Sequence, residues 1–153
     1  MSDKIDIWSV ESKLYAYVDA NGMRENYTYS KSFSLGNDHF VDVKLTNFSR
    51  NILTNKSVVG INHFVVSMNF RKKNVEEPWF RVDNESRNSG ESENYLHFHS
   101  TLNGKQFQEH QKIEGQLTIA EIISTTFDST YKILAEKFQN DVIVDGKSFV
   151  GSA

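Results

Sequence analysis

Residues 64–71 have the sequence Phe-Val-Val-Ser-Met-Asn-Phe-Arg. The large apolar side chains recur at every second position, at Phe64, Val66, Met68 and Phe70. Successive side chains of a strand point to opposite faces, so this spacing gives a strand with one apolar face. The stretch therefore predicts one strand of a sheet that buries a single face against other elements.

A second apolar pattern begins after Gly115 and has the period of a helix. Its residues follow one another at intervals of three or four: Ile119, Ile123, Phe127, Tyr131, Leu134 and Phe138. Thr118, followed three residues later by Glu121, is typical of a capping box at a helix start. We predict a helix over about residues 118–139, with this stripe packed on the apolar face of the sheet.

Shorter alternating stretches on both sides of residues 64–71 predict the other strands, at 14–18, 27–29, 41–45, 79–83, 95–102 and 105–113. Residues 19–22, Asp-Ala-Asn-Gly, predict a hairpin turn between the first two of these strands. Asn103-Gly104 predicts a two-residue turn between the last two.

The ends of this pattern are less regular. Residues 46–61 fit either a loop or a short helix. Residues 142–144 and 149–150 flank Asp145-Gly146 and predict a small terminal hairpin. With no internal repeat or linker, residues 1–153 are expected to form a single domain. The fold class predicted is α+β, a mostly antiparallel sheet of about 6–8 strands with one long C-terminal amphipathic helix packed on one face.

Composition narrows the class of protein without naming a function. The chain has no cysteine, which excludes disulfides, thiolate metal sites and a cysteine nucleophile. Its net charge of −3 gives no general attraction to nucleic acid, so any such contact has to be local. Residues 1–6 lack the pattern of a signal peptide, and no apolar run is long enough to span a membrane. We expect a cytoplasmic protein.

The segments 79–83 and 95–99 each separate apolar from polar side chains by alternation. We predict that they pair across the loop 84–94, with Asp83 opposite Tyr95. Arg81 would then face His97, and Trp79 would face His99. The tight turn at Asn103-Gly104 would place His110 opposite His97, on the same polar face.

This pairing gathers the candidate site residues on one face of the sheet. The candidate catalytic residues are His97, His99, Arg81 and Asp83, and the candidate ligand-binding residues are Asn84, Tyr95, His110 and Trp79. Arginine binds phosphate bidentately, and histidine exchanges protons near neutral pH. The same imidazoles, with Asp83, are also suited to a divalent metal, and a solvated sheet face commonly carries such residues without any site. The sequence leaves these three interpretations open.

The string Trp-Phe-Arg-Val-Asp-Asn at residues 79–84, followed by His-Phe-His at 97–99 and a helix, resembles the core of TumE-type toxins of bacterial toxin–antitoxin systems. The resemblance covers roughly residues 64–125 and rests on about six positions. It implies a toxin whose polar site residues are Arg81, Asp83, Asn84, His97 and His99. Residues 85–94 lack the Pro and His residues that the family tends to place in this loop.

Two classes of function follow. The first is a small toxin or defence-type protein that handles RNA or a nucleotide phosphate. Its enzyme class would be a ribonuclease or another phosphodiester-acting enzyme. The second is a non-enzymatic binding protein, such as an immunity protein, an antitoxin-like partner or a helix-grip ligand-binding module. The expected partners are a cognate antitoxin or another protein, or RNA or a nucleotide, and no membrane. No cofactor is expected, and the sequence leaves the oligomeric state undefined.

Overall fold

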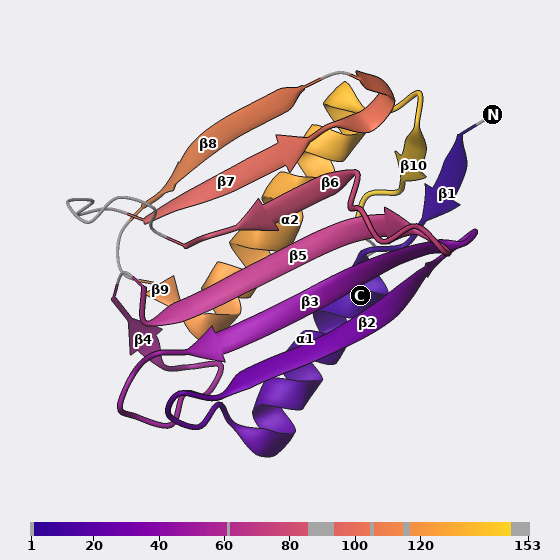
Figure 1. Ribbon diagram of the computed structural model, residues 1–153. Helices are drawn as coiled ribbons and strands as arrows, with labels where there is room; N and C mark the ends of the chain where they lie inside the picture. The colour runs from indigo at the N-terminus through magenta and orange to yellow at the C-terminus, as the bar shows by residue number, and fades with distance from the viewer. Residues whose placement is uncertain (1, 61, 86–93, 105, 115–116, 148–153) are drawn as a thin grey trace, which may run out of the picture.

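The computed structural model describes residues 2–60, 62–85, 94–104, 106–114 and 117–147. They form an α+β fold in which a six-stranded antiparallel sheet is covered by two helices, as the sequence predicts for the class. Figure 1 shows both helices behind the sheet, on the same face, while the opposite face carries no other element of the described chain. The protein therefore has one covered and one open sheet face.

The strands of the main sheet follow one another in the order β2-β3-β5-β6-β7-β8. Their bounds are β2 Thr28–Gly36, β3 His39–Asn47, β5 Phe64–Lys72, β6 Phe80–Asp83, β7 Asn94–Ser100 and β8 Phe107–Ile113. The alternating stretch that opens at Phe64 is β5, an interior strand paired with β3 on one side and β6 on the other. The strands predicted at 41–45, 79–83, 95–102 and 105–113 correspond to β3, β6, β7 and β8.

Two short strand pairs lie outside this sheet. β4 (Val58–Val59) pairs antiparallel with β9 (Leu117–Thr118), so most of residues 46–60 is loop. β10 (Val142–Val144) pairs in parallel with β1 (Asp3–Ile5), and the two strands lie side by side in Figure 1. The strand predicted at residues 142–144 is present as β10, and its partner among the described residues is β1. Residues 149–150, the other half of the predicted hairpin, lie outside the described residues.

The C-terminal helix α2 spans Ile119–Lys137, close to the predicted bounds. The Thr118 hydroxyl accepts a hydrogen bond from the Glu121 amide at 3.1 Å, and the Glu121 carboxylate accepts one from the Thr118 amide at 2.9 Å. This reciprocal pair confirms the capping box and satisfies two amides at the helix start. Hydrogen bonding to the Thr118 backbone and side chain also lowers the pKa of Glu121.

Residues 14–18 belong to a helix, not to a hairpin strand. The helix α1 spans Trp8–Asn21, and its buried apolar side chains Val10, Leu14 and Val18 follow at intervals of four. A five-residue alternation is too short to exclude this helical spacing, which residues 7–10 extend. Gly22, with φ +66°, ends the helix by donating its amide to the Val18 carbonyl at 2.8 Å. The Asn-Gly pair is thus a helix end instead of a hairpin turn.

The connection between β7 and β8 also differs from the predicted two-residue turn. Leu102–Gly104 forms a short 3-10 helix, and the last paired residues are Ser100 and Phe107. The longer connection keeps the predicted register, because a symmetrical extension of a hairpin loop leaves the pairs beyond it unchanged. His97 and His110 are therefore directly opposite each other.

The core lies between the covered sheet face and the helices. Its largest fully buried side chains include five phenylalanines: Phe64, Phe70, Phe80, Phe98 and Phe127. Four of these belong to β5, β6 and β7, and Phe127 belongs to α2. This packing is the predicted one, with the helix stripe against the alternating apolar residues of the strands.

We predict that Phe127→Ala lowers the free energy of unfolding by about 3–5 kcal/mol, because the ring is 1% exposed and its loss leaves a cavity. Lys132→Ala, an exposed position on the same helix, is the matched control and should change it by less than about 0.5 kcal/mol. Urea denaturation measures both. Equal effects of the two variants would contradict the packing of α2 on the sheet.

Candidate functional site on the open sheet face

The register of the six strands places the polar candidates in two neighbouring rows on the open face. One row runs Ser32, Asp42, Asn69, Arg81, His99 and Gln108. The next runs Ser30, Lys44, Ser67, Asp83, His97 and His110. Arg81, Asp83, His97, His99 and His110 are thus brought together on one face, as the sequence predicts.

The pairing of β6 with β7 differs from the predicted one by two residues. Arg81 is opposite His99 and Asp83 is opposite His97. A shift of two keeps every side chain on its face, so the composition of the polar face is unchanged. On the covered face, Val82 is opposite Phe98 and Phe80 is opposite Ser100. Alternation assigns side chains to faces but leaves open which residues are opposite each other, so the apolar pattern did not give this register. Because of this shift Tyr95 is not opposite Asp83, and its partner in β8 is Lys112.

Arg81 and His99 line a small hollow of 160 Å³ where β6 begins and β7 ends. Its other walls are Glu77, Pro78, Ser100 and Thr101. Arg81 is exposed and forms no ion pair with any described residue. Its guanidinium is therefore available to an anion, and His99 stands directly across the strand pair from it.

His97 lies deeper in the surface than the sequence suggests. Its side chain is 2% exposed, and its ring centroid is 4.5 Å from that of the exposed His110 in a perpendicular arrangement. A buried imidazole has little direct access to a ligand. His99 and His110 are consequently better placed than His97 to meet a molecule on this face.

Trp79 does not belong to the polar face. It precedes β6, is 7% exposed and packs in the core, with ring centroids 6.1 Å from Phe70 and 6.2 Å from Phe138. The alternation predicted it opposite His99 because it assumed that the strand begins at residue 79. The indole is instead turned into the aromatic core, where the burial of its large apolar surface is favourable.

Asn84 has a structural place that accounts for its polarity. Its side chain is 3% exposed, accepts a hydrogen bond from the Val66 amide at 2.7 Å and donates one to the Phe64 carbonyl at 2.9 Å. The amide group thereby continues the pairing of β6 with β5 beyond Asp83, the last paired residue. Asn84 is therefore a strand-pairing residue in the structure and not a surface ligand group.

The open face also carries charges that the sequence analysis did not single out. Together with Arg81 and Asp83, the open face carries the cations Lys44, Arg71 and Lys112 and the carboxylate Asp42. Among the described residues its lysines and arginines therefore number four and its carboxylates two. This excess of cations contrasts with the net charge of −3 of the chain. The signal was present in the alternation of residues 41–45 and 64–71, which puts Asp42, Lys44 and Arg71 on the polar side.

Asp42 and Arg71 form the best-defined ion pair of this face. The Arg71 Nε donates to the Asp42 carboxylate at 2.8 Å, and the Ser32 hydroxyl donates to the other oxygen. Burial would raise the pKa of Asp42, but these two hydrogen bonds and the Arg71 charge outweigh it, so the pKa is lowered. Asp42 therefore stabilises the sheet in its charged form.

Among the described residues no group of three histidine, aspartate or glutamate side chains is arranged to hold a metal ion. No helix in the described part of the chain is long and apolar enough to cross a membrane. Comparisons with protein-family models, with curated proteins and with solved structures find no match to this chain. The resemblance to TumE-type toxins therefore stays a prediction.

We predict that Asn84→Ala lowers the free energy of unfolding by about 1–3 kcal/mol, because it leaves a buried amide and a buried carbonyl of β5 without their partner. Asn51→Ala, at an exposed loop position, is the control. Urea denaturation of both variants gives the comparison. An Asn84→Ala protein of unchanged stability would return this residue to the candidate ligand-binding groups.

The lowered pKa of Asp42 predicts a pH-dependent contribution to stability. A carboxyl group whose pKa is lower in the folded than in the unfolded state stabilises the fold at pH values above its unfolded pKa. This stabilisation is lost as the pH falls through the folded pKa. At neutral pH the free energy of unfolding of the wild type should exceed that of Asp42→Asn. The difference should be at most about 1 kcal/mol, because solvent partly screens the Asp42–Arg71 pair. The difference should shrink below about pH 3.8. Thermal unfolding measured across pH, with Glu136→Gln as control, tests this; a pH-independent difference would contradict it.

Proposed function

We propose that the protein binds a phosphate-bearing ligand, RNA or a nucleotide, on the open sheet face. The observation that carries this proposal is the Arg81–His99 pair, which lines a hollow on a face where four cations oppose two carboxylates. Anionic ligands respond to the local potential more than to the net charge of the whole protein. The acidic composition is therefore compatible with a phosphate ligand at this face.

The two side chains would have different roles. The Arg81 guanidinium presents a planar fork of donors that matches two phosphate oxygens. The His99 imidazole would donate a hydrogen bond to the same group and, when protonated, add a charge to it. Phosphodiester cleavage would also need a proton donor and acceptor at the reacting oxygens, for which His99 and the exposed His110 are the candidates.

A ligand on the surface accounts better for the fold than one in the interior. A helix-grip binding module needs an open cavity between its sheet and its long helix. Here five fully buried phenylalanine rings occupy that layer. Binding at the open face leaves this packing intact.

We propose with this site the toxin role that the TumE resemblance implies. The protein would then act in the cytoplasm, with RNA as its target.

The second candidate function is the binding of a protein partner. It is favoured by β8, which pairs with β7 alone among the described strands and so presents one free edge of the main sheet. Free strand edges offer backbone groups to a strand of another chain.

We predict that Arg81→Lys weakens binding of a fluorescently labelled single-stranded RNA or a nucleoside monophosphate by about tenfold, because lysine keeps the charge but loses the bidentate fork. His99→Ala should weaken it comparably, since it removes the hydrogen bond that the imidazole would donate to the phosphate. Arg50→Lys, an exposed loop arginine, is the matched control. Fluorescence polarisation measures the affinity.

Growth and RNA integrity after induction in cells supply the second readout. Growth arrest with RNA loss in the wild type, relieved by His99→Ala, would support a ribonuclease toxin. Phosphate binding without either effect would support a non-catalytic module. Equal affinity of the wild type, Arg81→Lys and His99→Ala for every phosphate-bearing probe would overturn the proposed site.

A further inference from the structure

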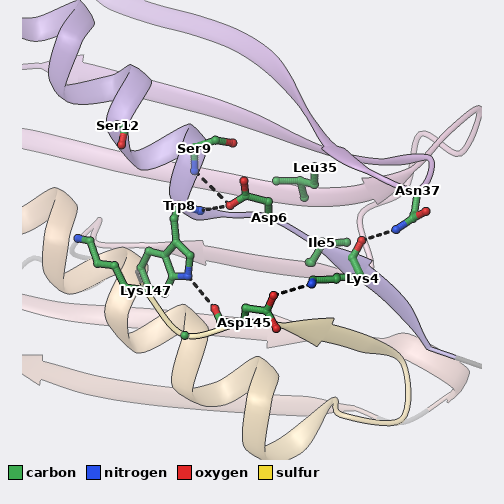
Figure 2. A pocket seen from close by; sticks show the side chains of 11 residues that line it. Lys4, Ile5, Asp6, Trp8, Ser9, Ser12, Leu35, Asn37, Asp145 and Lys147 are labelled. Carbon is green, nitrogen blue, oxygen red and sulfur yellow. Dashed lines mark hydrogen bonds and ion pairs between the residues drawn. The ribbon is translucent and has the colours of Figure 1, made fainter. Parts of the chain in front are cut away.

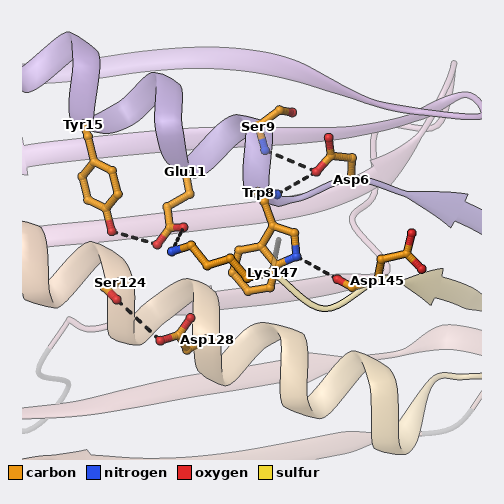
Figure 3. Close-up of polar contacts among 9 residues, drawn as sticks. All are labelled: Asp6, Trp8, Ser9, Glu11, Tyr15, Ser124, Asp128, Asp145 and Lys147. Carbon is orange, nitrogen blue, oxygen red and sulfur yellow. Dashed lines mark hydrogen bonds and ion pairs between the residues drawn. The ribbon is translucent and has the colours of Figure 1, made fainter. Parts of the chain in front are cut away.

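A carboxylate is buried on the other side of the molecule, between the two helices. Glu11 of α1 is 1% exposed, on a helix whose other buried residues are Val10, Leu14 and Val18. Its carboxylate accepts a hydrogen bond from the Tyr15 hydroxyl at 2.8 Å and contacts the Lys147 ammonium at 2.7 Å (Figure 3). Burying an unpaired carboxylate is costly, so this position requires a cation.

The cation comes from the segment that follows β10. The Lys147 Nζ lies 5.4 Å from the centroid of the Trp8 ring, within the range of a cation–π contact. The Trp8 Nε1 donates in turn to the Asp145 carbonyl at 2.8 Å, which holds the indole beside the ammonium. The Lys147 ammonium thus contacts the Glu11 carboxylate and lies near the face of the Trp8 ring. The Tyr15 hydroxyl binds the same carboxylate.

The phenol is suited to this setting. Burial, and then the hydrogen bond to Glu11, raise the pKa of Tyr15. The hydroxyl therefore keeps its proton and stays a donor to Glu11. With the phenol occupying one carboxylate oxygen, the other is left for a cation, and it is the oxygen that Lys147 contacts.

An open hollow of 570 Å³ lies beside this cluster, and Figure 2 shows the side chains that line it. Trp8, Ser9, Ser12, Asp145 and Lys147 belong to its wall, and Glu11 does not. The Lys147 side chain is 39% exposed, whereas Glu11 behind it is shielded from solvent. Lys147 is therefore the part of the cluster that a molecule in the hollow would meet first.

We propose that Glu11, Tyr15 and Trp8 form a binding site for a primary alkylammonium group, which Lys147 of the same chain fills in this structure. A ligand with such a group enters from the hollow, displaces Lys147 and places its own ammonium on Glu11. The site lies on the covered side of the sheet and is independent of the phosphate-binding face proposed above. The segment 145–147 then acts as an internal competitor of the ligand.

The test is chemical rescue of a Lys147→Ala protein. This substitution removes the native ammonium from a buried carboxylate and should lower the Tm by about 5 °C or more. Millimolar n-butylammonium, which replaces the lost side chain, should restore most of that Tm. Neutral n-butanol and tetramethylammonium, which lacks N–H donors, should restore little. The diamine putrescine reports whether the hollow holds a second ammonium.

Two variants serve as controls. Glu11→Gln combined with Lys147→Ala removes the carboxylate, and n-butylammonium should then have no effect on the Tm. Lys4→Ala breaks an exposed ion pair with Asp145, whose side chains are 65% and 64% exposed, and should not respond to the amine. Equal rescue of all three proteins, or no rescue of a folded Lys147→Ala protein, would overturn the proposal.

The wild type gives a readout that does not depend on the folding of a variant. The Trp8 indole N–H gives its own signal in a ¹H–¹⁵N spectrum, and displacement of Lys147 should shift it during titration with n-butylammonium. The Trp79 indole, 7% exposed in the aromatic core, is the internal reference and should stay unchanged. A Trp8 signal unmoved at a hundred millimolar amine would count against the site.

Discussion

The fold depends on burial of one face of the main sheet by two helices. β5 supplies Phe64 and Phe70 to that face, and α2 packs against β5 and β6. Because side chains alternate along each strand, covering one face necessarily leaves the other to polar residues. The open face with Arg81 and His99 is therefore a consequence of the same packing that forms the core. The interior holds aromatic rings, so a ligand is expected at the surface.

The two proposed sites illustrate different electrostatic situations. On the open face, cations outnumber carboxylates across six strands, and the Arg81 guanidinium has no ion-pair partner among the described residues. Between the helices, one buried carboxylate has a partner at close distance, contributed by the far end of the chain. The first suits an anion that arrives from solvent, because cations outnumber carboxylates on that face. The second suits a cation that replaces one already present, because the compensating charge is only partly buried.

Two polar residues serve the fold itself, and one of them, Asn84, is a candidate ligand-binding residue of the sequence analysis. Asn84 bonds to two backbone groups of β5, and the Ser100 hydroxyl donates to the Trp79 carbonyl at 2.5 Å. These contacts satisfy backbone groups that continue the sheet beyond its paired residues. The residues that remain for a ligand are consequently fewer than the sequence suggested, with Arg81 and His99 at their centre and His110 next to them.

The sequence by itself determined the α+β class, the alternation of β5, the capped helix α2 and the shared face of Arg81, Asp83, His97, His99 and His110. These features follow from local periodicity and local hydrogen bonding. Tertiary structure decided what periodicity leaves open. It made residues 8–21 a helix, since five alternating residues fit both periods and burial of Val10, Leu14 and Val18 selects one. It set the register of β6 and β7, because alternation assigns side chains to faces and leaves open which residues are opposite each other. It also brought Lys147 to Glu11, a contact between opposite ends of the chain that no local pattern encodes.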